Sequence, residues 1–389
     1  MKKEKFLILE IAPAGVNALF LTLGENRGIV VEKYVENASL RKFLQSPMRR
    51  VTQKSWEGEY LFKRGRRKVI ATAHPSLATT IPLPLELPRE KADAKFEITL
   101  AELENLIAQA MAKVFNQCRS EAAKRLGIHE LDTILVGAEA RHFKIDGKSV
   151  VNPAGFTGKK ISLILELRFT TRELFEELKG FFNAPDHFFF VEGPQSRLLA
   201  IARSRPLPLA LIEAEGGGAA VYVMAEAKEG HPVLYREKLG WDFDELIRRI
   251  AAELGVSMAA AERLYREYLH GNMSKDALRA MKRVIDPAVR HFTEALEKEK
   301  LGGYAYVDAP HELPFETPHR AAGVTIEPVP LGEILESLDF PSSVAVKDGG
   351  AVPRRVLVRN VLPFIEAYFD KSNSEINQKL RRRLHWLLN

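Results

Sequence analysis

The stretch Asp146–Leu163, which reads DGKSVVNPAGFTGKKISL, carries the strongest fold signal of this 389-residue chain. Asp146 and Gly147 predict a tight turn, because both residue types tolerate the backbone angles that such a turn needs. A short strand follows, then a rigid corner at Asn152-Pro153 and a glycine-bounded loop that leads into another strand. These signals by themselves predict a hairpin-rich surface element.

The segments around this stretch predict a subdomain. The prolines between Thr80 and Arg89 predict a boundary. Thr99 followed by Glu102 forms a capping box, which predicts that an amphipathic helix begins there. The expected elements of the subdomain are the helix Thr99–Leu126 and the strands Thr133–Val136 and Lys160–Arg168.

The two halves of the chain begin alike. Each starts with a strand that ends in an acidic residue, Glu10 or Glu213, and a turn and a second strand follow. This weak repetition indicates two similarly built α/β units. The strands expected in the first half are Phe6–Leu9, Ala18–Leu23, Gly28–Val35 and Phe188–Val191, with a helix at Thr170–Phe182. Those expected in the second half are Leu209–Glu213, Ala219–Met224, Pro232–Lys238 and Tyr304–Val307.

The Asp146–Leu163 stretch resembles a segment of the bacterial cell-division actin FtsA, whose extra subdomain carries the pattern D-G…N-P-x-G-[FM]-[ST]-G before a strand. The resemblance implies an α/β, two-lobed and duplicated actin-like ATPase fold, with an inserted FtsA-type 1C subdomain and a C-terminal amphipathic helix. The expected parts are the first lobe at 1–79 and 169–205, the 1C subdomain at 80–168, the second lobe at 206–340, a lobe closure and linker at 341–371, and a membrane-targeting helix at 372–389.

The resemblance also implies a nucleotide site. In this superfamily the turn of each half offers backbone N–H groups of small residues to the phosphates and an acid to magnesium. A helix in the second half contacts the nucleoside. The matching residues of this chain are Glu10, Gly15, Glu213, Gly216, Gly217, Gly218, Gly240 and Glu262.

Several of these positions depart from the family pattern. Glu10 stands in place of an Asp, and Pro13 removes a backbone N–H where donors are needed. Ala219 and Ala220 replace polar residues of the second turn, and Tyr265 stands where the nucleoside-contacting helix carries a Lys. The sequence therefore predicts that ATP with Mg²⁺ binds weakly and is hydrolysed negligibly, and it assigns no catalytic residue and no metal ligand.

Composition narrows the remaining possibilities. The chain has a single cysteine, Cys118, so neither a disulfide framework nor a cysteine metal site is expected. Its net charge of +6 is mild for this length. The basic segment Arg41–Lys68 alternates with apolar residues, which favours a solvated hairpin over a nucleic-acid surface. No signal peptide or membrane span is evident, so we expect a cytoplasmic location.

The C-terminus has the pattern of an in-plane membrane anchor. The sequence Ser372–Glu375 predicts the start of a helix. Beyond it one arc of the helix is apolar, while basic residues lie at or outside the arc's edges, a pattern typical of helices that lie on anionic lipid. The residues expected to bind the inner face of the membrane are Ile376, Lys379, Leu380, Arg381, Arg382, Arg383, Leu384, Trp386, Leu387 and Leu388. A helix docked on its own domain is the alternative.

By resemblance, the predicted function is to tether filaments of the FtsZ-like tubulin homologue to the cytoplasmic membrane, with self-polymerisation as a further property. A PilM-like cytoplasmic component of type IV pilus assembly is the alternative. Such a protein binds the cytosolic peptide of a membrane partner and needs no amphipathic tail. An active sugar- or acetate-kinase-like enzyme is disfavoured by Pro13 and Ala219-Ala220, because it would need intact phosphate turns.

Overall fold

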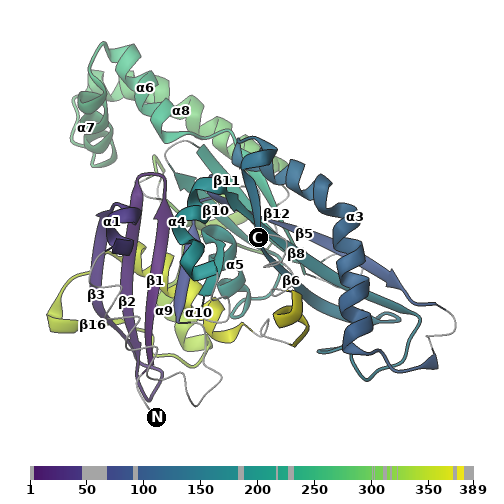
Figure 1. The fold of residues 1–389 in the computed structure, drawn as a ribbon. Coiled ribbons are helices and arrows are strands. Elements are labelled where there is room, and N and C mark those ends of the chain that lie inside the picture. Colours follow the sequence, from purple (N-terminus) through teal and green to yellow (C-terminus); the bar gives the residue numbers. More distant parts are fainter. Residues whose placement is uncertain are drawn as a thin grey trace. The chain divides into compact units, whose positions relative to one another are not determined.

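The chain folds into two compact units, Met1–Arg197 together with Ser343–Asn389, and Leu198–Ser342 (Figure 1). The structure, a computed structural model, describes residues 4–45, 68–90, 95–182, 188–215, 218–226, 232–299, 301, 303–309, 313–315, 318–321, 323–370 and 375–380. Among these residues no helix is both long and apolar enough to cross a membrane.

The first unit is built on a sheet of six strands in the order β16-β3-β2-β1-β4-β9. Strands β1, β2 and β3 are antiparallel, whereas β1, β4 and β9 run parallel. The parallel strands are almost wholly apolar and buried, as expected where helices cover a sheet. The strands are β1 (Glu4–Ala12), β2 (Gly15–Leu23), β3 (Ile29–Ala38), β4 (Val69–Ala73), β9 (Phe188–Glu192) and β16 (Ala345–Val346), and the helices are α1 (Leu40–Gln45), α4 (Arg172–Phe182), α5 (Gly193–Ala202) and α10 (Arg354–Phe369).

The second unit repeats this strand order. Its sheet runs β12-β11-β10-β13-β15-β14, in which the first five strands match β3-β2-β1-β4-β9 in order and direction, and β14 adds an antiparallel strand at the far edge. The strands are β10 (Leu209–Glu215), β11 (Gly218–Glu226), β12 (Pro232–Leu239), β13 (Tyr304–Asp308), β14 (His319–Ala321) and β15 (Val324–Pro328), and the helices are α6 (Phe243–Leu254), α7 (Met258–Leu269), α8 (Lys275–Lys298) and α9 (Leu331–Ser337). The repeated order confirms the predicted duplicated α/β fold.

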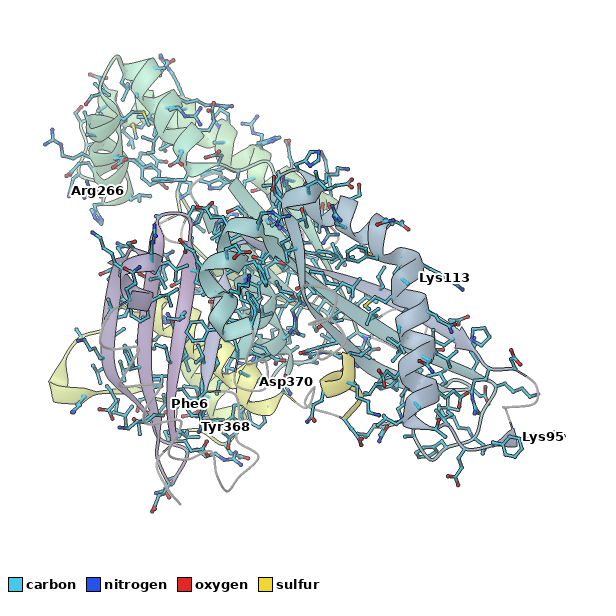
Figure 2. The ribbon with its side chains drawn as sticks, in the orientation of Figure 1. Phe6, Lys95, Lys113, Arg266, Tyr368 and Asp370 are labelled. Carbon is cyan, nitrogen blue, oxygen red and sulfur yellow. The ribbon has the colours of Figure 1, made fainter. Side chains whose placement is uncertain are left out.

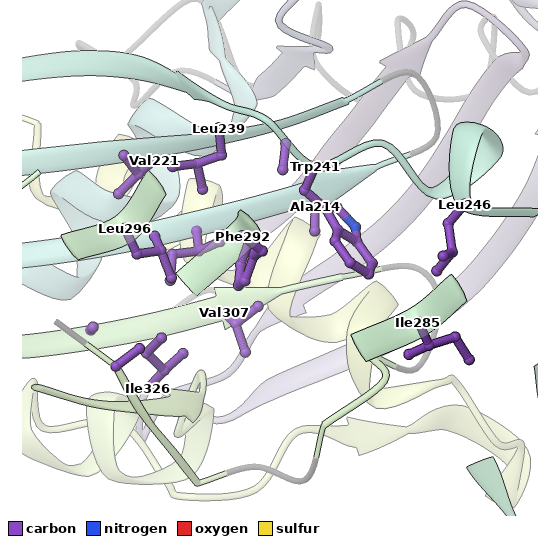
Figure 3. Close-up of a cluster of buried hydrophobic side chains, with 14 of the residues drawn as sticks. Ala214, Val221, Leu239, Trp241, Leu246, Ile285, Phe292, Leu296, Val307 and Ile326 are labelled. Atoms are coloured by element: carbon purple, nitrogen blue, oxygen red, sulfur yellow. The ribbon is translucent and has the colours of Figure 1, made fainter. Parts of the chain in front are cut away.

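The core of the second unit lies between its sheet and α6–α8 (Figure 3). Trp241 packs edge-on against Phe292, with ring centroids 5.5 Å apart. The sequence predicted this unit at 206–340, and the contacts of the backbone delimit it at Leu198–Ser342.

An inserted subdomain interrupts the first unit between β4 and β9. Its sheet has the order β5-β8-β6-β7, and the long helix α3 packs on it (Figure 1). The side chain of Thr99 accepts a hydrogen bond from the N–H of Glu102, so the predicted helix start is confirmed. The elements are β5 (Ala78–Pro88), α3 (Leu100–Leu126), β6 (Thr133–Ile145), β7 (Lys148–Ser149) and β8 (Lys160–Thr171).

The turn and loop predicted from Asp146–Leu163 are confirmed. Asp146 and Gly147 have φ of 47° and 85°, and they connect β6 to the short antiparallel strand β7. The Asp146 carboxylate accepts hydrogen bonds from the N–H groups of Lys159 and Lys160. A Cβ added at Gly158 would lie 2.2 Å from the side chain of Ile145, so only glycine fits at this position.

The proline-rich segment Thr80–Arg89 is not a boundary but most of the edge strand β5. Pro82, Pro84 and Pro88 occupy alternate positions of the strand. The N–H of Thr80, in the same phase, points away from β8 and donates to Glu192. The three proline nitrogens therefore face the free edge, where no ladder hydrogen bond is lost.

Two further expectations need correction. The segment 341–371, predicted as a lobe closure and linker, contains α10, which is a core helix rather than a linker: it packs against β1 and β4 and buries ten residues. Its apolar run of Val, Leu, Phe and Ile is long enough to cover a sheet, which explains why it is a core element. In the basic segment Arg41–Lys68, residues up to Gln45 belong to α1 and not to a hairpin, and residues 46–67 lie outside the described part of the chain.

Candidate functional site

Polar residues gather where the parallel strands of the first unit end. In the strand register Glu10 of β1 pairs with Thr72 of β4, and Ala73 of β4 pairs with Glu192 of β9. These positions are the carboxyl ends of neighbouring parallel strands, where open α/β sheets bind their ligands. The predicted residue Glu10 therefore lies at the expected edge of the sheet.

The Glu10 carboxylate is already paired. An Nη of Arg359, on α10, donates to one oxygen at 2.9 Å, and the side-chain amide of Asn17 donates to the other at 3.1 Å. The two charged side chains are only 13% and 7% exposed. A fixed guanidinium thus neutralises the acid that the resemblance assigns to the magnesium side. This donor set does not fit Mg²⁺ with a polyphosphate, and Pro13 in the same turn removes a phosphate donor.

Gly15 is explained by strand packing. Its φ is 151°, and a Cβ at this position would lie 2.9 Å from the carbonyl oxygen of Ala38 on β3. The glycine lets β3 approach the hairpin of β1 and β2, so its presence needs no nucleotide.

The residues of the second unit that the resemblance assigns to the nucleotide do not gather into one site in the described structure. Glu213 is buried and pairs in register with Asp308 of the neighbouring parallel strand β13, so two acids meet at the end of adjacent strands. Gly216 and Gly217 lie outside the described residues. Gly218 begins β11 with a φ of 132°. A Cβ at Gly240 would lie 2.3 Å from the imidazole of His291, so the packing of α8 accounts for this glycine.

The residues predicted to contact the nucleoside lie on α7. Glu262 is exposed on the helix surface. Tyr265, at the position of the family's Lys, is buried and packs edge-on against Phe243, with ring centroids 5.4 Å apart. A core tyrosine cannot supply the ammonium group of that Lys.

Two partners at these sites escaped the sequence analysis. Arg359 reaches Glu10 from 349 positions along the chain, and no local pattern marks it. Asp308 directly follows the predicted strand Tyr304–Val307, so its place at a strand end was a usable signal.

The C-terminal segment docks on the inserted subdomain. Residues 375–380 are helical, and Ile376 and Leu380, 2% and 0% exposed, belong to the same buried cluster as the apolar face of α3. The side-chain amide of Asn377 donates to the carbonyl of Ala140 at 3.1 Å and accepts from the N–H of Ala140 at 2.8 Å. Lys379 lies 3.9 Å from Glu104 on α3.

Ile376 and Leu380, which were expected to contact lipid, are buried within the protein in this structure, as the alternative of a helix docked on its own domain predicts. Ala140 lies in β6 opposite Leu165 of β8, and β7 pairs only with the far end of β6. The outward N–H and C=O of Ala140 would otherwise stay unpaired at a sheet edge, and Asn377 satisfies both. Residues 381–389, which include the other predicted lipid-binding residues Arg381–Arg383, Leu384 and Trp386–Leu388, lie outside the described part.

A buried ionic cluster holds the chain just before this segment. Arg141 of β6 lies 2.9 Å from Glu139, 3.3 Å from Glu166, 3.6 Å from Glu366 and 3.5 Å from Asp370. Burial works against the charge of Arg141, but the four acids outweigh it and raise the pKa of Arg141 well above its ordinary value. Glu366 lies in α10, and Asp370, labelled in Figure 2, ends it. This cluster therefore ties α10 to the subdomain.

Comparisons with known proteins place the chain among distant structural relatives. No family model and no curated protein matches it. Among solved structures, a PilM–PilN type IV pilus biogenesis complex matches with 13% identity over 97% of this chain and 98% of the other, at a TM-score of 0.48. The ethanolamine utilization protein EutJ from Carboxydothermus hydrogenoformans matches with 9% identity over 94% and 90%, at 0.32. A glucokinase from Balamuthia mandrillaris in complex with glucose matches with 8% identity over 97% and 94%, at 0.40. All three lie below 25% identity and a TM-score of 0.5, so we take no function from them.

Proposed function

We propose that this chain is an actin-like scaffold protein that does not turn over ATP and that binds a short helical segment of a membrane-associated partner on its inserted subdomain. This is the pilus-type alternative of the sequence analysis. The observation that carries it is the seat of residues 375–380 on β6 and α3, which we call the docking surface.

The docking surface combines the features that recognise a helical peptide. It buries two apolar side chains, Ile376 and Leu380, that lie one helical turn apart. Its Ala140 binds the side-chain amide of Asn377 through both the backbone N–H and the backbone C=O. A ligand without such an amide leaves a buried N–H and C=O unpaired, which typically costs about 1–3 kcal/mol. The surface therefore favours the order apolar–Asn–x–x–apolar.

The division-type function receives less support. Tethering FtsZ-like filaments requires a tail whose apolar arc is free to enter anionic lipid, and the first two members of that arc are buried in the protein. The FtsZ-like partner and self-polymerisation stay proposals of that alternative.

A peptide selection tests the proposed function. The bait is the full chain with Leu380→Asp, in which a buried carboxylate disfavours docking of the tail. A library of random helical peptides should return the order apolar–Asn–x–x–apolar. A second bait, with Ala140→Pro added, lacks the outward N–H and should lose those peptides while a melting curve shows the fold intact. Selected peptides without an Asn preference would refute the pilus-type function, and filament-dependent sedimentation with an FtsZ-like protein would favour the division type.

A further inference from the structure

The apolar face of the C-terminal helix can pack on the inserted subdomain or enter lipid, but it cannot do both at once. Ile376 and Leu380 are the first two residues of the apolar arc that the sequence predicts to continue through Leu384, Leu387 and Leu388. In the structure both side chains are buried against the subdomain. A side chain with 0% exposure, as Leu380 has, cannot lie in a lipid surface at the same time. Docking therefore leaves the helix only part of its arc for lipid.

The charges on the helix favour an anionic membrane as the competitor for this face. Arg381, Arg382 and Arg383 follow Leu380 without an intervening acid. A basic residue near an anionic leaflet contributes about 1 kcal/mol. On the docking surface Lys379 lies 3.9 Å from Glu104, at the outer limit of an ion pair and partly accessible to water, so this pair is worth little.

The helix can leave without disturbing α10. Asp370 and Glu366 stay bound to Arg141, whose side chain is only 15% exposed, so the chain is fixed at the end of α10. The contacts that must break include the burial of Ile376 and Leu380, the two hydrogen bonds of Asn377 and the Lys379–Glu104 pair.

From these observations we propose that the C-terminal helix is a latch, which occupies the docking surface away from membranes and is withdrawn from it by anionic lipid. The latch depends on the proposed function in one respect only, namely that a partner segment binds the docking surface once the C-terminal helix has left it. Because lipid and docking surface bind the same face, each weakens the other by the same factor. The scaffold would then accept its partner segment only at a membrane.

Lipid affinity of the whole chain, compared with that of the free tail, tests the latch without any partner. A synthetic peptide of residues 372–389 and the full chain are each titrated with vesicles of phosphatidylcholine containing phosphatidylglycerol. The peptide should bind at least tenfold more tightly, because the full chain must first undock its helix. The same titrations are repeated with Asn377→Ala in both molecules. Asn377 itself lies near the apolar arc, so its replacement changes lipid affinity directly, and the free peptide measures that direct effect.

Loss of the two Asn377 hydrogen bonds should raise the lipid affinity of the full chain about tenfold more than that of the peptide. Glu375→Ala, on an exposed residue of the same turn, should leave the ratio unchanged and serves as the matched control. Equal affinities of chain and peptide, or an equal response of both to Asn377→Ala, would overturn the latch. So would vesicle binding by neither molecule. Such a result leaves the peptide selection unaffected, so the two proposals fail separately.

Discussion

At the residue scale, two buried arginines decide what this chain can do. Arg359 donates to the carboxylate of Glu10, which the resemblance assigns to magnesium, and Arg89 donates to the loop 152–158 through the carbonyl of Gly158. Arg89 is 1% exposed, pairs with both oxygens of Glu102, and donates to the carbonyls of Phe96 and Gly158. Each guanidinium holds oxygen acceptors around one positive charge.

The Arg359–Glu10 pair predicts a chain that is silent towards ATP and depends on this pair for stability. Phosphate release with ATP and Mg²⁺ should not exceed that of a blank. Arg359→Met should lower the free energy of unfolding by about 3–5 kcal/mol, because it leaves a buried carboxylate uncompensated. Adding Glu10→Gln should restore part of that loss, as a denaturant titration of both variants would reveal. Magnesium-dependent turnover that disappears with Glu213→Ala would contradict this account.

Arg89 leads to a prediction for the loop 152–158. Arg89→Met keeps the apolar stem but removes four hydrogen bonds, so Phe96 and Gly158 lose their shared donor. Amide hydrogens of residues 155–160 should exchange faster by at least an order of magnitude, while those of the second unit stay unchanged. Arg125→Met, which loses only a partly exposed pair with Glu121, is the control.

At the scale of elements, the sequence predicted strands and helices well wherever one local rule decides them. The apolar runs of β1, β10 and β13 and the cap of α3 are such cases. It misread β5, because prolines indicate a boundary until the partner strand shows that their nitrogens face a free edge. It assigned Ile376 and Leu380 to lipid, whereas the structure buries them in the protein, because an apolar helical face looks alike whether protein or membrane covers it. Tertiary partners of Glu10 and Ala140 more than 200 residues away had no local signal.

The prolines of β5 should prevent the edge of this sheet from pairing with a strand of another molecule. Replacing Pro82 and Pro84 with valine restores two outward N–H groups on an exposed strand, which is a template for pairing with another chain. The double variant should form dimers or larger species at concentrations where the parent is monodisperse, as light scattering after gel filtration would show. The matched control is Pro88→Val, because Pro88 lies at the end of β5. Val35→Pro would not serve as a control, because β3 is an inner strand between β2 and β16. Unchanged association would mean that the prolines do not protect this edge.

At the scale of the molecule, the chain uses one strand order twice and inserts a second sheet into the first copy. The insertion leaves and re-enters the first unit through Thr79 and Phe169, which are cross-strand partners of β5 and β8. The order of strands was predictable because the pattern of strand, turn and strand recurs. The return of residues 343–380 to the first unit was not, because α10 and the docked turn owe their positions to Arg359, Arg141 and Ala140.

This arrangement predicts that the inserted subdomain can be excised. Because Thr79 and Phe169 lie opposite each other, two glycines should join them in place of residues 80–168, with the chain ended after Asp370. The six-stranded sheet and its own core cluster remain, so the shortened chain should be soluble and melt cooperatively.

The ionic cluster supplies an internal control. In the full chain, Glu366→Gln with Asp370→Asn leaves buried Arg141 with two fewer counter-charges and should lower the melting temperature. In the excised chain Arg141 is gone and water reaches both acids, so the same pair of substitutions should leave the melting temperature nearly unchanged. An equal loss in both chains would mean that these acids act within α10 alone, and an insoluble excised chain would mean that the subdomain is part of the first unit's core.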